Sequence, residues 1–186
     1  MTELKAPEIK TERLMLRALT LTDAPAMYSY RSAPEVMRHQ NWHPASEKEI
    51  QAFIRKNRRI KFNTANTWVQ FGIYLKPTNE LIGDIGIHFL PLDNWQVEIG
   101  FTISPKYQGK GFATEAVRQL LNYLFNNLGK HRVIASVDPE NASSIRLLER
   151  VGMRKEGHFI KSIWNGKGWA DDSTYAILQE DWPALQ

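Results

Sequence analysis

The sequence predicts an α+β protein in which a mixed sheet carries helices on its faces. Three observations lead to this class. Segments with strand-like patterning alternate with segments whose apolar residues recur every three or four positions. Their order along the chain is β-α-α-β-β-β-α-β-α-β-β. The length of 186 residues, with 42% hydrophobic residues and no repeat or Pro/Gly/Ser-rich linker, fits a single domain over 1–186.

The first third of the chain is expected to hold one strand and two helices. Residues 13–19 alternate well enough for a strand, and a capping residue and a proline mark the start of a helix over about 22–31. Ser46 and Glu49 have the spacing of a capping box. A second amphipathic helix should therefore follow Ser46 and end before Asn63.

Three strands are expected in the middle of the chain. They cover residues 67–75, 81–89 and 96–103, and the turn residues at 76–80 predict a hairpin between the first two. Because they follow one another through short connections, they should form an antiparallel meander.

The final third begins with the clearest helical pattern of the sequence. Its apolar residues run from Phe112 to Phe125, and Gly129 closes the segment. A strand at 132–137, a short helix at about 142–151 and two strands joined by a turn at 165–168 complete the fold.

Composition excludes several kinds of chemistry. The chain has no cysteine, which removes disulfides, thiolate zinc sites and a cysteine nucleophile. Its five histidines form no spaced ligand set, so no metal is assigned. The N-terminus lacks an apolar signal core and no segment resembles a membrane helix, so we expect a cytoplasmic protein without a membrane partner. A net charge of +4 favours an anionic ligand without requiring nucleic acid.

The segment from Glu98 to Thr114 has the composition of an anion site. A strand leads into a turn with two glycines, Gly109 and Gly111, and then into the long helix. Such a turn can direct backbone N–H groups outward, and the first helical turn leaves more of them unpaired. A phosphate or pyrophosphate could bind there. The alternative is a strand-to-helix turn that only needs glycine, and neither common nucleotide-binding glycine motif is complete here.

The residues Gln108 to Ala113, QGKGFA, fit the Q/R-x-x-G-x-G/A signature of acetyl-CoA-dependent N-acetyltransferases of the GNAT superfamily. The wider pattern resembles the Rim-type branch, which acetylates protein N-termini, including those of ribosomal proteins. Four further stretches agree in order and spacing over about residues 10–182: TERLMLRAL, VEIGFTISPKYQGKGFATEA, NASSIRLLERVGM and GWADDSTYAILQEDW. The resemblance implies a mostly antiparallel sheet of about seven strands with helices on both faces.

The resemblance also implies acetyl-CoA as cosubstrate and assigns its contacts. The pantetheine arm would pair with the strand residues Phe101, Thr102 and Ile103, and Asn141 would contact the same arm. The pyrophosphate would lie on the backbone amides of the turn and helix start, namely Gln108, Gly109, Lys110, Gly111, Phe112, Ala113 and Thr114.

An acceptor amine must lose a proton before it attacks the thioester. At pH 7 this costs about 4.6 kcal/mol for a lysine-like amine and about 1 kcal/mol for an α-amino group. Related enzymes use a glutamate at the place of Glu98 as general base, often through water. The alternative role for Glu98 is an ordinary strand carboxylate that faces solvent or an ion pair.

The coenzyme A thiolate leaves more easily if it receives a proton. Many superfamily members supply a tyrosine at the position of Leu148, whereas the Rim-type pattern Asn-x-x-Ser implies a role for Ser144. Ser144 could instead bond to the local backbone at a helix start. Since the sequence has no G-x-S-x-G motif, direct transfer from the thioester is the simpler scheme.

Two residues are candidates for the acceptor side. Asp171 and Tyr175 match the D-x-x-x-Y ending of the family, and Asp171 could orient the amine or stabilise a turn. Trp42 and His43 resemble an aromatic acceptor-side segment of the branch, whereas the alternative for a His-Pro after a Trp is loop packing. A basic cluster could attract an acidic acceptor or RNA, or simply form a solvated helix face; it consists of Arg55, Lys56, Arg58, Arg59 and Lys61.

The leading interpretation is therefore transfer of acetyl to a protein α-amino group. The alternatives are a small-amine acetyltransferase acting on a polyamine or an aminoglycoside, and a noncatalytic acyl-CoA-binding module. The net positive charge argues weakly against a polycation, and carboxylates on the acceptor side would reverse that argument. An RNA-binding protein ranks last because the sequence has no stacking-aromatic signature. The sequence leaves monomer and homodimer open.

Overall fold

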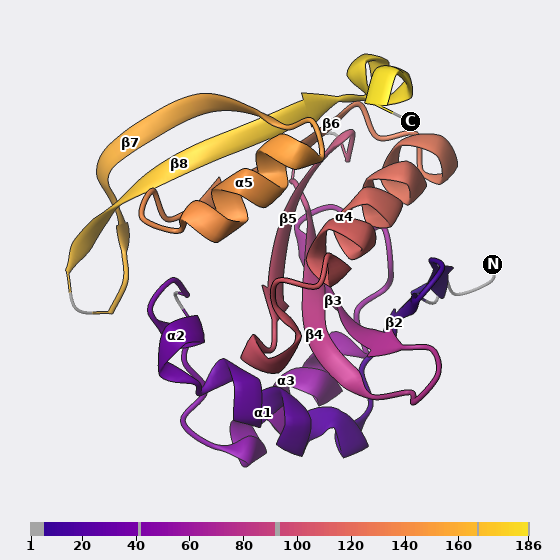
Figure 1. Ribbon diagram of the computed structural model, residues 1–186, viewed down its shortest axis with the longest axis vertical. Helices are drawn as coiled ribbons and strands as arrows, with labels where there is room; N and C mark the ends of the chain where they lie inside the picture. Colours follow the sequence, from indigo (N-terminus) through magenta and orange to yellow (C-terminus); the bar gives the residue numbers. More distant parts are fainter. Residues whose placement is uncertain (1–5, 41, 92–93, 167, 186) are drawn as a thin grey trace.

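One sheet of eight strands runs through the computed structural model, which describes residues 6–40, 42–91, 94–166 and 168–185 (Figure 1). The strand order is β1-β2-β3-β4-β5-β6-β8-β7. Every neighbouring pair is antiparallel except β5 and β6, which are parallel. In Figure 1 the long β7–β8 hairpin arches outward past α5.

The strands are β1 Ile9–Lys10, β2 Leu14–Ala18, β3 Thr67–Leu75, β4 Leu81–Phe89, β5 Gln96–Ile103, β6 Arg132–Val137, β7 Arg154–Trp164 and β8 Trp169–Leu178. The α-helices are α1 Ala24–Arg31, α2 Pro34–Met37, α3 Glu47–Asn57, α4 Phe112–Asn122 and α5 Ala142–Arg150. Short 3-10 segments lie at Leu21–Asp23, Pro105–Tyr107 and Gln179–Leu185, and a π-helical turn at Tyr123–Asn127 continues α4.

The α+β class with a mixed, mostly antiparallel sheet is confirmed, and the three central strands have the predicted bounds. The sheet has eight strands instead of about seven because β1 pairs with β2 over only two residues, too few to show alternation in the sequence. The four-residue helix α2 was not predicted for the same reason. The predicted turn at 165–168 closes with a bond from the Asn165 amide to the Gly168 carbonyl at 3.1 Å; Lys167 within it lies outside the described residues.

Two helix predictions need correction at their ends. Helix α3 ends at Asn57, and Ile60 packs in the turn beyond it. Ser46 does accept the Glu49 amide, but the Glu49 carboxylate bonds to the Ala45 amide and the Trp42 indole, so the capping box is only half formed. The long helix changes to π-helical bonding after Asn122 before Gly129 ends it with a positive φ.

The sheet buries a different group of helices on each face. In β3, Phe71 and Ile73 belong to a core that includes buried residues of α4 and α5. The next residue, Tyr74, points to the other face and belongs to a core with residues of α1 and α3. This alternation follows from the two-residue period of a strand, and it confirms that helices cover both faces.

A buried ion pair joins α1 to the middle of the sheet. Asp84 of β4 is completely buried, and the Arg31 guanidinium bonds to both of its carboxylate oxygens. The Tyr30 hydroxyl and the Gln70 amide also donate to this carboxylate. Burial and the nearby Asp84 raise the pKa of Tyr30 well above its ordinary value. Burial alone would lower the pKa of Arg31, but the Asp84 carboxylate outweighs it and raises that pKa.

Strands β5 and β6 separate after a short stretch of pairing. Only Gln96–Glu98 pair with residues of β6, at Arg132–Ile134. From Ile99 onward, β5 bonds to β4 on one side and has no strand partner on the other among the described residues. The open edge of β5 faces the site described below.

We expect Asp84→Ala to lower the free energy of unfolding by about 3–5 kcal/mol, because Arg31 would remain buried without a counter-charge. Urea unfolding of the variant and the wild type measures the difference. Lys106→Gln is the matched control, since it breaks an exposed ion pair with Glu80 at 3.3 Å and should cost less than about 1 kcal/mol. Equal, small losses in both variants would contradict a structural role for the buried pair.

Candidate functional site

Two adjoining pockets lie where β5 and β6 separate. The turn-side pocket has a volume of about 440 Å³ and is lined by the glycine turn, the start of α4 and one side of α5. The hairpin-side pocket has a volume of about 580 Å³ and is lined by β5, β6, the segment after α2 and the β7–β8 hairpin. Both pockets share six residues, which we call the junction: His39, Gln40, Phe101, Thr102, Asn141 and Ser144.

The glycine turn of the turn-side pocket presents unpaired amides. Gly109 and Gly111 have φ of +74° and +78°, which glycine adopts without the strain of a side chain. Within the described chain, the N–H groups from Gly109 to Thr114 make no backbone hydrogen bond. This arrangement suits a phosphate or pyrophosphate at the positive end of α4.

Gln108 differs from the other amides predicted to hold the pyrophosphate. Its N–H donates to the Pro105 carbonyl at 3.2 Å, and its side-chain amide donates to the Ile103 carbonyl at 2.9 Å. Gln108 therefore braces the turn against the end of β5. The amides open to a ligand are those of the six residues after it.

Two arginines of α5 add positive charge to this pocket, and sequence patterning did not single them out. Arg146 and Arg150 line it, and Arg150 also reaches across to the Thr114 hydroxyl at 3.4 Å. Their place depends on the packing of α5 against α4, which no local pattern predicts. The pocket thus combines free amides with cationic side chains.

A hydrogen-bond network around Glu115 holds the glycine turn in place. The Glu115 carboxylate accepts from the Thr11 hydroxyl, and from the amide and guanidinium of Arg13 at 2.9 and 2.6 Å. Arg13 in turn donates to the Lys110 carbonyl at 3.2 Å. Burial would raise the pKa of Glu115, but these donors outweigh it and hold that pKa below its ordinary value.

The open edge of β5 connects the two pockets. Phe101, Thr102 and Ile103 line the turn-side pocket, and Thr102 and Ile103 are buried. An extended chain that carries amide groups could bond to this edge in the way a neighbouring strand would.

The start of α5 contributes polar groups to the junction. The Asn141 side-chain oxygen caps the helix by accepting from the backbone amide of Ser144 at 3.1 Å. The side-chain nitrogen of Asn141, Nδ2, bonds to no described residue. The Ser144 hydroxyl likewise has no hydrogen bond within the described ranges, so it does not bond to the local backbone as its alternative role required. Leu148, one turn further along, is completely buried at the wall of the hairpin-side pocket.

Glu98 lies on the wall of the hairpin-side pocket, one strand away from a histidine. Its carboxylate is 3.5 Å from the Nδ1 atom of His88, its cross-strand neighbour on β4. About a quarter of the Glu98 side chain is exposed, and Trp68 stacks on the His88 ring at 5.3 Å between centroids. Glu98 is thus accessible from the pocket and also contacts the His88 imidazole.

The two predicted acceptor-side residues both line the hairpin-side pocket but come from opposite sides of it. Trp42 packs against Phe53 at 4.8 Å, and the Arg31 guanidinium lies over its ring at 5.1 Å. Asp171 lies beside a bulge of β7, where it accepts from the Lys161 amide at 2.9 Å and from His158 at 2.9 Å. These two donors, in that order, lower the pKa of Asp171.

Three further residues of this pocket were not predicted. Asp172 is buried and accepts from the Ser136 hydroxyl at 2.6 Å. His39, after α2, donates from Nδ1 to Asp138 at 2.6 Å across the junction. His39 and Asp138 are 99 positions apart, so their contact has no signal in one sequence. By contrast, His43 bonds to the Met37 and Gln40 carbonyls and lines neither pocket, which agrees with the loop-packing alternative.

The basic cluster lies outside both pockets. Its five side chains are exposed on α3 and the residues after it, and no described acidic group pairs with any of them. Within the described chain, no three His, Asp or Glu side chains gather as a metal ion would require. No helix among the described residues is long and apolar enough to span a bilayer.

A pocket for a phosphate-bearing donor that opens into a second, carboxylate-lined pocket is the arrangement of a group-transfer enzyme. Residues 13–154 match the acetyltransferase (GNAT) domain. The chain therefore belongs to the GNAT family of N-acetyltransferases, which use acetyl-CoA as cosubstrate. This confirms the resemblance read from the glycine turn and its flanking segments.

Known relatives and structures agree with this assignment. An uncharacterised N-acetyltransferase of Bacillus subtilis, YnaD, is 36% identical, with 94% of this chain and 98% of the relative covered. A GNAT-family acetyltransferase structure from Bacillus anthracis has a TM-score of 0.84 at 37% identity and covers 94% and 99% of the two chains. The [ribosomal protein uS5]-alanine N-acetyltransferase of Escherichia coli is 25% identical, with 94% and 92% covered.

We expect Glu115→Gln to lower stability at pH 7 by about 1 kcal/mol, or about 3 °C in Tm. A carboxylate whose pKa is depressed in the folded state stabilises fully above its unfolded pKa of about 4.3. That contribution is lost as the pH falls through the lower folded pKa. In thermal melts, the Tm difference between variant and wild type should therefore shrink as the pH falls below about 4.3. A Tm difference that persists unchanged at pH 3 would contradict a stabilising role for the ionised Glu115 carboxylate.

Proposed function

We propose that this chain transfers the acetyl group of acetyl-CoA directly to the α-amino group of a protein N-terminus. The observation that carries the proposal is the junction, where a pocket suited to the cofactor opens into one with room for an incoming chain end. Similarity to the uS5-alanine N-acetyltransferase along nearly the whole chain supports a protein acceptor. An α-amino group also needs the least help from a base at neutral pH.

In this scheme the donor lies along the turn-side pocket. The amides from Gly109 to Thr114 hold the pyrophosphate, and the edge of β5 at Phe101–Ile103 pairs with the pantetheine arm. The free side-chain nitrogen of Asn141 donates to a carbonyl of the same arm. These contacts place the thioester at the junction, where the Ser144 hydroxyl can bond to the sulfur or to a water beside it.

Glu98 acts as the general base in this proposal. It lines the pocket that the amine enters, and its partial exposure leaves room for a water that carries the proton from the ammonium. His88 holds the carboxylate from the adjacent strand. The free amine then attacks the thioester carbonyl carbon, and Asp171 and Trp42 orient the rest of the acceptor.

A small polyamine is the second candidate, and one observation favours it. Four carboxylates line the hairpin-side pocket, from Glu98, Asp138, Asp171 and Asp172. Net positive charge argued against a cationic substrate because like charges repel, but these carboxylates would attract one. All four already contact a neighbouring hydrogen-bonding side chain, namely His88, His39, His158 or Ser136, which leaves fewer carboxylate oxygens free for the ammonium groups of a polycation. We therefore keep the protein N-terminus as the first choice.

We expect Glu98→Gln to lower turnover about 10²-fold while the affinity for acetyl-CoA stays unchanged, because the amide cannot accept the proton. Steady-state kinetics over a pH range, with acetyl-CoA affinity from calorimetry, provide the measurement. His88→Gln is the control, since it removes the neighbouring imidazole and keeps the Glu98 carboxylate. A pH–rate profile that Glu98→Gln leaves unchanged would remove Glu98 as the base.

The acceptor itself can be identified by release of coenzyme A thiol from acetyl-CoA. N-terminal peptides, polyamines and aminoglycosides are offered in parallel, and the protein adds no thiol background because it has no cysteine. We expect turnover on peptides, with mass spectrometry placing the acetyl group on the α-nitrogen. Turnover on polyamines alone would replace the proposal by the second candidate. Acetyl-CoA binding without turnover on any amine would indicate a noncatalytic module.

A further inference from the structure

The junction between the two pockets contains one imidazole. Of its six members, His39 alone has a side chain of the kind that enzymes most often use as a general acid or base; the others are Gln40, Phe101, Thr102, Asn141 and Ser144. A thioester held in the turn-side pocket would reach the acceptor through this junction. His39 therefore lies where the two pockets meet.

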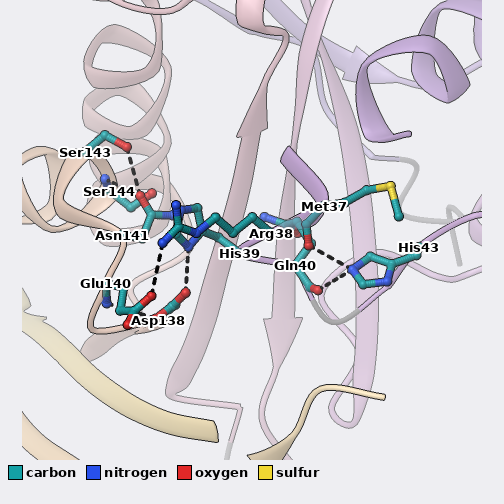
Figure 2. A network of polar contacts seen from close by, with 10 residues as sticks. All are labelled: Met37, Arg38, His39, Gln40, His43, Asp138, Glu140, Asn141, Ser143 and Ser144. Atoms are coloured by element: carbon teal, nitrogen blue, oxygen red, sulfur yellow. Dashed lines mark hydrogen bonds and ion pairs between the residues drawn. The ribbon is translucent and has the colours of Figure 1, made fainter. Parts of the chain in front are cut away.

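The contacts of His39 leave one ring nitrogen available. Nδ1 donates to Asp138 at 2.6 Å, and 19% of the histidine side chain is exposed. Nε2 has no hydrogen bond within the described parts of the chain. Figure 2 shows His39 and Arg38 reaching together from the segment after α2 to Asp138 and Glu140 in the turn before α5. Asp138 thus holds the ring and determines which nitrogen carries the proton toward it.

The transfer reaction needs a proton at the departing sulfur. A thiol has a pKa of about 8.5, so a thiolate that leaves at neutral pH is stabilised by protonation. The position that could carry a tyrosine is Leu148, which is buried and apolar. The Ser144 hydroxyl can relay a proton but cannot be its net source, since a hydroxyl does not ionise near neutral pH.

We propose that His39, oriented by Asp138, is the general acid that protonates the coenzyme A thiolate as it leaves. The amine nitrogen has bonded to the acetyl carbon and loses its extra proton to a water in the hairpin-side pocket. The carbon–sulfur bond then breaks, and its electron pair goes to sulfur. The imidazolium Nε2–H gives its proton to that sulfur and becomes neutral imidazole with Nδ1–H still on Asp138. The partly exposed ring regains a proton from solvent before the next turnover.

This assignment rests on acetyl transfer from acetyl-CoA and not on which amine accepts it. The charged side chains that line the two pockets around the junction are Glu35, Arg38, Glu98, Asp138, Arg146, Arg31, Arg150, Asp171 and Asp172, and Glu140 pairs with Arg38 beside them. Glu140 lines neither pocket and is exposed, and its ion pair with Arg38 joins the same two segments as the His39 contact. Glu140→Gln is therefore the matched control for His39→Gln.

The first test needs no acceptor. Coenzyme A is bound to the enzyme, and the thiolate absorbance is titrated against a desulfo-coenzyme A complex as blank; the absence of cysteine makes the signal specific. We expect the bound thiol pKa to lie about one unit below that of free coenzyme A, as beside other imidazolium groups. His39→Gln should abolish this shift and Glu140→Gln should keep it. An identical thiol pKa in wild type and His39→Gln would overturn the proposal.

The second test uses whichever amine the wild type acetylates. We expect His39→Gln to lower kcat about 10²-fold with the KM for acetyl-CoA changed less than about twofold, and Asp138→Asn to lower kcat less. Glu140→Gln should match the wild type. Thermal melts and coenzyme A binding check each fold, and His39→Asn replaces His39→Gln if the latter does not bind the cofactor. Equal kcat in wild type and His39→Gln would overturn the proposal.

The two tests distinguish failure of the proposed protein acceptor from failure of the proposed role of His39. Turnover on polyamines and none on peptides would end the proposed protein acceptor and leave the His39 measurements intact. If no amine is acetylated, the thiol titration alone decides whether His39 interacts with the sulfur. A loss of kcat in Glu140→Gln equal to that in His39→Gln would show that the contact between the two segments matters and that the imidazole does not.

Discussion

Both pockets depend on the separation of β5 from β6 after three residue pairs. A strand edge inside a protein normally bonds to a neighbour, because a buried backbone group without a partner costs free energy. Here the edge beyond Ile99 is left open, and α4 connects the two strands as the crossover that parallel pairing requires. The separation brings the glycine turn, the start of α5 and the hairpin around one space. A ligand with amide groups along its length can satisfy the exposed edge.

The buried pair of Asp84 and Arg31 positions the other side of the same space. It fastens the C-terminal end of α1 to the sheet, and the chain continues directly into α2 and the segment that carries His39. The Arg31 guanidinium also supports the Trp42 ring on the wall of the hairpin-side pocket. A charge pair without solvent keeps its geometry because any displacement would leave a charge unpaired. This wall of the hairpin-side pocket is therefore anchored to β4, the strand that pairs with β5.

The two pockets use different parts of the chain for recognition. The turn-side pocket relies on backbone amides and a strand edge, which any sequence with the right glycines can present. The hairpin-side pocket is lined by side chains from the segment after α2, β5, the turn before α5 and β8. Because these segments are distant in the sequence, the lining of this pocket can change while the fold and the turn-side pocket remain the same. The proposed roles of Glu98 and His39 place a base and an acid in the lining of this second pocket.

The sequence by itself determined the elements and the donor turn. Alternation over nine residues defines β3 and β4, and Gly109 and Gly111 mark a turn because only glycine adopts their φ without strain. Tertiary structure decided the rest. A carboxylate such as that of Asp84 inside an apolar strand indicates that it has a buried partner. No sequence pattern near Asp84 identifies that partner as Arg31, which is 53 positions away. No local pattern predicts the contact of His39 with Asp138 either, nor the hydrogen bond that occupies the Gln108 amide. Periodicity reports which face of an element is buried, whereas contacts between polar groups depend on how the elements pack.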